Sequence, residues 1–180
     1  MNSMYYSKPQ EELLSVLKIL GGMWKRQVRV LMRLRFGMSE KSVDSAISQL
    51  RYGGDLRDMG TYILAANRQF DIQLARAVDI ALALSGSKAP DIFPRKKPVF
   101  LTTYLPEREM QLCVLYVPVG KERARSLTLD SLRAEKTMKT LYALLLDEVG
   151  QTAALCAETP CLLAWPDESE KLELKKWEGI

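Results

Sequence analysis

Apolar residues recur every three to four positions in three segments of the first fifty residues, which is the spacing of one helix face. The apolar positions are Leu13, Val16, Leu17 and Leu20; Val28, Leu31 and Met32; and Val43, Ala46, Ile47 and Leu50. Ser7 and Ser39 precede the first and third segments as N-caps, and paired glycines end both. The pattern predicts three short helices, the second running from about Trp24 to Leu34.

A short hairpin follows in the stretch DLRDMGTYILA, residues 55–65, with its turn at Asp58-Met59-Gly60. Three helices followed by a tight hairpin is the order of a winged helix-turn-helix, in which the third helix presents its outer face to the DNA major groove. We therefore predict a winged helix-turn-helix domain over residues 1–66.

Residues 67–180 show a different order. The stretch RQFDIQLARAVDIALALSG, residues 68–86, reads as a fourth helix, and three prolines exclude a helix from the basic stretch after it. The remaining segments predict strands at 99–105 and 110–119, a loop at 121–126, a helix at about 129–149, strands at 151–158 and 159–166, and an edge strand at 172–178. Helices and strands in this order make an α+β fold.

Charge and residue types narrow the function. Residues 1–70 carry 11 Lys and Arg against 6 Asp and Glu, whereas the rest of the chain is close to neutral. A basic first third indicates that a polyanion partner binds there. The chain has no histidine and three scattered cysteines, which excludes Ser-His-Asp and Cys-His catalysis and the common zinc sites. We expect a non-catalytic cytoplasmic protein with no cofactor, no metal and no membrane partner.

The third predicted helix leaves small and basic side chains on its outer face. Serines approach base edges or phosphates closely, and lysine or arginine pairs with phosphate, although Glu40 and Asp44 on the same helix repel the DNA backbone. The candidate DNA-binding residues are Lys25, Arg26, Lys41, Ser45, Ser48, Arg51 and Arg57.

The run from Leu13 to Ala65 resembles the N-terminal region of the replication-relaxation family of plasmids and conjugative elements, and small proteins of related mobile elements of Gram-positive bacteria. The resemblance rests on ELLSVLKIL, KRQVRVLMRL and SVDSAISQLRYGGDL, and departs from the family where Met23-Trp24 replaces the usual Ser/Thr cap. It implies a DNA-binding protein of a mobile element that acts in transcription or replication control.

That family carries a restriction-endonuclease-like core after its winged helix, so the α+β part resembles such a core in degenerate form. The nuclease chemistry needs an acid-x-Lys pair on a strand, around a divalent metal. The equivalent strand here reads QLCVLYVPV and contains neither residue type. Two alternatives to DNA binding remain: an adaptor that binds other proteins or itself through the same helices, and a divergent metal-dependent nuclease.

Overall fold

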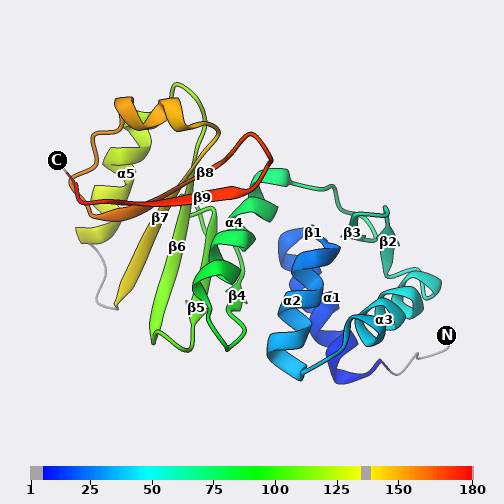
Figure 1. Ribbon diagram of the computed structural model, residues 1–180. Helices are drawn as coiled ribbons and strands as arrows, with labels where there is room; N and C mark the ends of the chain where they lie inside the picture. Colours follow the sequence, from blue (N-terminus) through cyan, green and yellow to red (C-terminus); the bar gives the residue numbers. More distant parts are fainter. Residues whose placement is uncertain (1–5, 135–138, 180) are drawn as a thin grey trace.

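The computed structural model describes residues 6–134 and 139–179, which form two lobes side by side (Figure 1). The N-terminal lobe contains α1 to α3 and a small sheet. The C-terminal lobe begins at α4 and contains a larger sheet. The fold is mixed α+β, as the sequence predicts.

The predicted helices and hairpin of the N-terminal lobe are all present. Its elements are α1 (Lys8–Leu20), β1 (Gly22–Trp24), α2 (Lys25–Phe36), α3 (Glu40–Tyr52), β2 (Leu56–Asp58) and β3 (Tyr62–Ala65). Strand β1, which the sequence did not predict, pairs with β3 and completes an antiparallel sheet of order β1-β3-β2. Gly22 permits this pairing, because a Cβ at that position would lie 2.9 Å from the carbonyl oxygen of Ile63.

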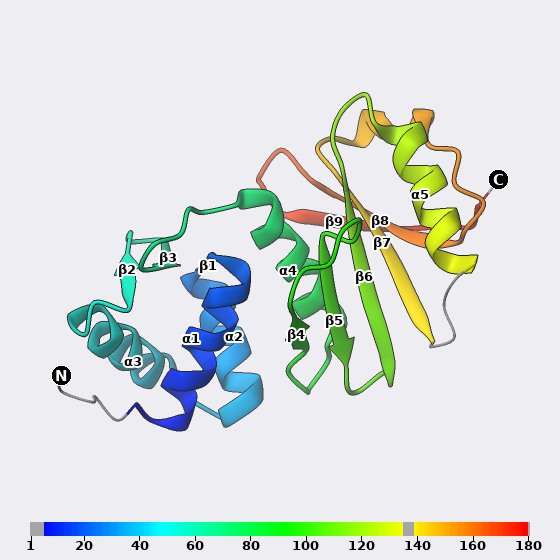
Figure 2. The ribbon, with the colours of Figure 1, turned by 180° about the vertical axis from the view of Figure 1, so that it is seen from behind.

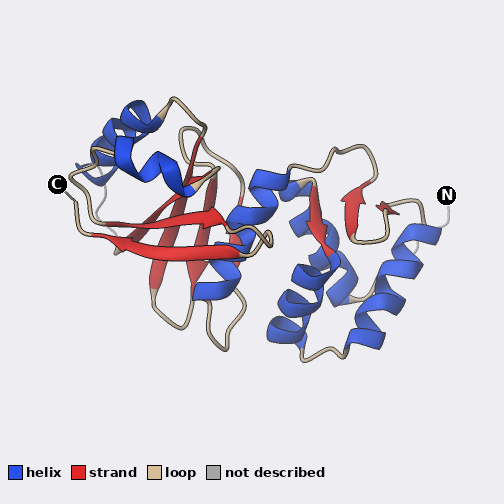
Figure 3. Ribbon diagram, turned by 45° about the horizontal axis from the view of Figure 1, so that its top comes forward, coloured by secondary structure: helices blue, strands red, loops and turns tan. Residues whose placement is uncertain are grey.

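The C-terminal lobe is a three-layer arrangement around a six-stranded sheet of order β4-β5-β6-β7-β8-β9. Its elements are α4 (Ile72–Leu84), β4 (Asp91–Phe93), β5 (Leu101–Leu105), β6 (Met110–Val117), α5 (Glu122–Ala134), β7 (Thr140–Leu146), the 3₁₀ helix η1 (Val149–Ala154), β8 (Cys161–Pro166) and β9 (Leu172–Trp177). The central strands β6, β7 and β8 are parallel, and the outer pairings are antiparallel. Helix α4 covers one face, and α5 with η1 covers the other (Figures 1 and 3).

The sheet has two apolar faces because alternate side chains of a strand point to opposite sides. On β6, Cys113, Leu115 and Val117 join the core beneath α5. Leu112 and Val114 face the other way, into a core that includes residues of α4 and continues into α1, α2 and α3. Helix α4 therefore packs between the two lobes, and both lobes share one apolar interior.

Three predictions for the C-terminal lobe were wrong. Residues 121–126 belong largely to α5 rather than to a loop, the region predicted as a helix at 129–149 contains strand β7, and 151–158 holds the end of η1 instead of a strand. Residues 135–138 of that predicted helix lie outside the described residues. β7 is a fully covered strand in a parallel arrangement, so its apolar run lacks the polar alternation that marks a strand in sequence.

The predicted strands β5, β6, β8 and β9 are present, with β9 at the edge of the sheet as expected. In the described part of the chain, no helix combines the length and apolar character needed to cross a membrane.

Candidate nucleic-acid interface

Helix α3 has one buried face and one solvent-exposed face. Val43, Ala46, Ile47 and Leu50 are buried in the core of the N-terminal lobe. The Oγ of Ser39 accepts a hydrogen bond from the backbone N–H of Ser42 (3.3 Å), which caps the helix as predicted. The side chains of Lys41, Ser45, Ser48 and Arg51 are exposed on the outer side. The structure thus brings four of the seven predicted residues together on one helix surface.

The C-terminal end of α3 exposes an aromatic side chain that the sequence analysis did not select. Tyr52 is 81% exposed, and the guanidinium of Arg51 lies 5.1 Å from the centre of its ring. A tyrosine held beside an arginine can contact sugar, base or protein surfaces. The sequence indicated Tyr52 only by its place as an aromatic residue just after the apolar stripe.

Asp44, one of the two acidic residues that fit the outer face poorly, is paired with α2. The guanidinium of Arg29 donates to both carboxylate oxygens of Asp44, at 2.9 and 3.0 Å. This bidentate contact neutralises the carboxylate. Glu40 remains exposed at the start of the helix.

A groove of about 250 Å³ lies between α2 and the start of α3. Arg26, Arg29 and Arg33 line its α2 side, and Ser39 and Glu40 line its α3 side. Arg33 is exposed, and its guanidinium has no hydrogen-bond or ion-pair partner within residues 6–134 and 139–179. The groove therefore places the guanidinium of Arg33 next to the outer α3 surface, on the side opposite Glu40.

Two of the predicted DNA-binding residues, Arg57 and Lys25, lie at the β2–β3 hairpin or contact it. Arg57 is exposed, and its guanidinium donates to the carbonyl of Arg68 (2.5 Å). Lys25 is not free, because its ammonium forms an ion pair with Asp58 at 2.8 Å. Burial disfavours the charged form of Asp58, but hydrogen bonds from Lys25 and from the Gly60 N–H outweigh it and lower the pKa of Asp58. Lys25 thus holds the hairpin against α2.

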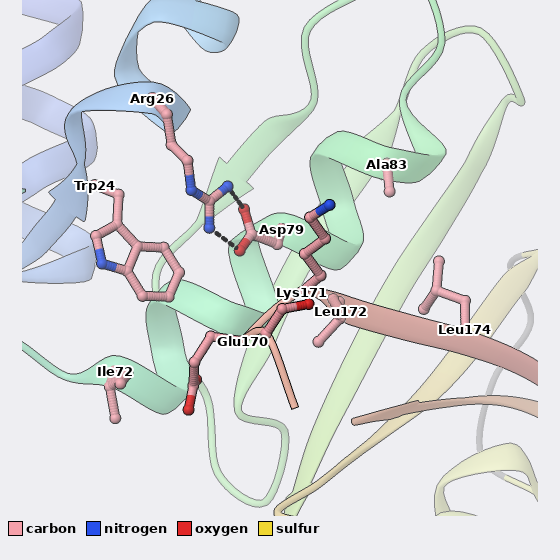
Figure 4. A pocket seen from close by; sticks show the side chains of 10 residues that line it. Trp24, Arg26, Ile72, Asp79, Ala83, Glu170, Lys171, Leu172 and Leu174 are labelled. Carbon is pink, nitrogen blue, oxygen red and sulfur yellow. Dashed lines mark hydrogen bonds and ion pairs between the residues drawn. The ribbon is translucent and has the colours of Figure 1, made fainter. Parts of the chain in front are cut away.

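Arg26 reaches from α2 to the C-terminal lobe. Its guanidinium makes a bidentate contact with Asp79 of α4, at 2.6 and 2.7 Å, and stacks 4.6 Å from the ring of Trp24 (Figure 4). The hydrogen bonds to Asp79 raise the pKa of Arg26. The Nε2 of Gln27 donates to the Ala75 carbonyl and to Asp79. This group joins the two lobes, a role that the sequence did not indicate.

Beside this junction lies a cleft of about 730 Å³, lined by Trp24, Ile72 and residues of the β8–β9 turn and β9 (Figure 4). Arg76 of α4 is ion-paired with Glu170 of that turn.

Near the carboxyl ends of the parallel strands, the hydroxyl of Tyr116 donates to Asp147, which also accepts from Gln73 (2.7 Å). Burial and the Asp147 carboxylate raise the pKa of Tyr116 to about 12. These contacts join α4 to the sheet.

The described residues contain no group of three or more Cys, Asp or Glu side chains placed to hold a metal ion. Strand β6, where the nuclease chemistry would need an acid-x-Lys pair, carries Gln111 and Cys113 on the α5 side of the sheet.

Comparisons of the chain with protein-family models, curated proteins and solved structures found no match.

Proposed function

We propose that residues 1–66 form a winged helix-turn-helix that binds duplex DNA through α3, and that the protein acts in transcription or replication control of a bacterial mobile element without catalysing a reaction. The observation that carries the proposal is the outer face of α3, where Lys41, Ser45, Ser48 and Arg51 are exposed together while the opposite face is buried. The element order α1-β1-α2-α3-β2-β3 supports it.

The charges around α3 support a phosphate-binding surface. Lys41 and Arg51 lie on the helix, Arg57 lies on the adjacent hairpin, and Arg33 adds a free guanidinium in the groove beside the helix. Asp44 does not oppose them, since Arg29 neutralises it. Lys25 and Arg26 act instead by holding the hairpin and α4 in place.

The second candidate is a protein-interaction adaptor on the same scaffold. It is favoured by the exposed apolar groups near the proposed DNA surface, Tyr52 on α3 and Met59 at the hairpin tip, which are 81% and 51% exposed. Exposed aromatic and methionine side chains are typical of protein-binding surfaces. The two candidates differ in electrostatics, because phosphate contacts release counterions and protein contacts of this kind do not.

The experiment is fluorescence anisotropy of the full chain with labelled random-sequence duplexes across a series of salt concentrations. We expect binding that weakens steeply as salt rises, with a slope of roughly −0.9 per phosphate contact on logarithmic axes. No duplex binding at low salt, with the protein folded, would overturn the DNA proposal and favour the adaptor.

The two serines of α3 test contact with the bases in a separate experiment. Replacing Ser45 and Ser48 with alanine should change the sequences selected from a random pool more than it changes the overall affinity.

A further inference from the structure

We propose that β9 is the contact strand of a homodimer, in which two copies of the chain join their large sheets edge to edge by antiparallel pairing centred on Leu174. This inference rests on the C-terminal lobe alone and does not depend on the DNA proposal. The two edge strands of the six-stranded sheet, β4 and β9, differ in length and in what covers them.

The β4 end of the sheet is short and covered. Strand β4 has three residues, and α1 packs beside it. Arg35 of α2 donates to the Pro90 carbonyl (2.6 Å) and to Asp91 (2.9 Å), which closes this end against the N-terminal lobe. Pro94 follows the strand and offers no backbone N–H. This edge is blocked.

The β9 end is twice as long and open. Strand β9 has six residues and pairs along its whole length with β8. Within the described part of the chain no strand lies on its other side. Trp177 anchors the strand by donating from Nε1 to the Ala157 carbonyl (3.0 Å). The outer row of backbone N–H and C=O groups is therefore held in place without a strand partner, which is a template for another strand.

The sequence of β9 is self-complementary in one register. Two copies of a strand paired antiparallel are related by a two-fold axis perpendicular to the sheet, so each residue faces one an even number of positions away. An axis through Leu174 places Leu174 opposite its own copy and Glu173 opposite Lys175 of the second copy, twice. Opposite charges directly across a strand pair stabilise the pairing.

The neighbouring registers are unfavourable. An axis through Lys175 sets that lysine against itself, and an axis through Glu173 sets that glutamate against itself. Like charges directly opposite one another oppose pairing. Of the registers centred on residues 173, 174 and 175, the one through Leu174 combines an apolar centre with two charge pairs.

The side chains that this register uses are available. Glu173, Lys175 and Lys176 are exposed, and none has an ion-pair partner within residues 6–134 and 139–179. Leu174 is an apolar side chain 38% exposed beside the cleft that Ile72 and Ala83 of α4 line. A second copy gives Glu173 and Lys175 partners of opposite charge and covers Leu174, while Lys176 lies opposite Leu172 of the second copy.

The test is sedimentation velocity of the full chain without DNA. Six residues a side is less than the 20–30 of a standard interface, so we expect a dimer with a micromolar Kd that forms as the concentration rises from about 1 to about 200 µM. Glu173→Lys places lysine opposite lysine twice and should weaken the dimer by about 10-fold or more. The double variant Glu173→Lys/Lys175→Glu restores both pairs with reversed charges and should recover the dimer.

Glu168→Lys is the matched control, because it makes the same charge change in the exposed β8–β9 turn outside the strand. It should dimerise like the wild type, and thermal melts should show all variants folded. A wild type that stays monomeric at every concentration overturns the proposal. The lysines of β9 would then serve to prevent pairing at an exposed edge strand. A Glu173→Lys variant that dimerises like the wild type, or a double variant that does not recover, overturns this register.

Discussion

Arg29 and Asp44 form a bidentate ion pair between α2 and α3, which neutralises one carboxylate on the proposed DNA surface. Both side chains are partly exposed, at 35% and 47%, so the pair contributes no more than about 1 kcal/mol to folding. Its larger effect is to keep a carboxylate and a guanidinium from acting separately at the surface.

Removing this carboxylate should strengthen DNA binding. Asp44→Asn takes one negative charge from α3 and releases Arg29 to meet phosphate, so we expect affinity at low salt to rise by about 3- to 10-fold. Anisotropy against one duplex measures this. Glu178→Gln, an exposed carboxylate in the C-terminal lobe, should leave affinity unchanged. Weaker binding by Asp44→Asn would show that Arg29 and α3 do not face the DNA.

Tyr52 should matter for binding and hardly at all for folding. It is 81% exposed, and replacing such a side chain with alanine changes the free energy of unfolding by about 0.5 kcal/mol or less. If its ring contacts DNA, Tyr52→Ala should weaken duplex binding several-fold while Tyr52→Phe retains most of the affinity. Equal affinities for wild type and Tyr52→Ala would remove this residue from the interface.

The contact between Arg26 and Asp79 should stabilise the junction of the two lobes. Asp79→Asn keeps an acceptor for Gln27 but removes the charge that holds Arg26. Because Arg26 is 60% exposed, we expect a loss of about 1–2 kcal/mol in the free energy of unfolding rather than the full value of a buried charged contact. Urea denaturation of Asp79→Asn beside the Glu178→Gln control measures it. An unchanged midpoint would contradict a stabilising role.

Because of Tyr116, we expect the free energy of unfolding to fall at high pH. Its pKa in the folded chain is about 12, above the ordinary value of 10.0, because of burial and the Asp147 carboxylate. A raised pKa gives stability that is fully present below pH 10 and is lost as pH rises towards 12. Wild type should therefore lose more stability than Tyr116→Phe between pH 9 and 11 in denaturant titrations. Parallel losses in the two proteins would refute the assignment.

The sequence predicts best where local signals agree. Helices α1 and α3 combine an apolar stripe with a serine cap and a glycine stop, and the hairpin has its turn residues, so all of them could be placed. β1 has three residues and is defined only by its pairing with β3, which no local pattern reports. The exposed face of α3 follows from the stripe on its opposite face, so four of the candidate residues could be located together.

The errors arise where burial or distance removes the signal. In β7, Leu144, Leu145 and Leu146 are all fully buried, and such a run fits a core helix as well as a covered strand. Charged residues made the start of α5 look like a loop, although they are the solvent side of a helix. Arg26 meets Asp79 across 53 positions of sequence, and nothing local indicates that an arginine beside the proposed DNA surface joins the lobes instead.

The central claim is tested most directly by the salt dependence of duplex binding in Lys41→Ala/Arg51→Ala. The matched control is Lys121→Ala/Arg123→Ala, which removes two exposed positive charges at the start of α5, at the opposite end of the molecule from α3 (Figure 2). With thermal melts showing both double variants folded, we expect the α3 variant alone to bind weakly and to flatten the salt slope by about two units. The account is contradicted if the folded α3 variant binds duplex DNA with the affinity and salt slope of the wild type.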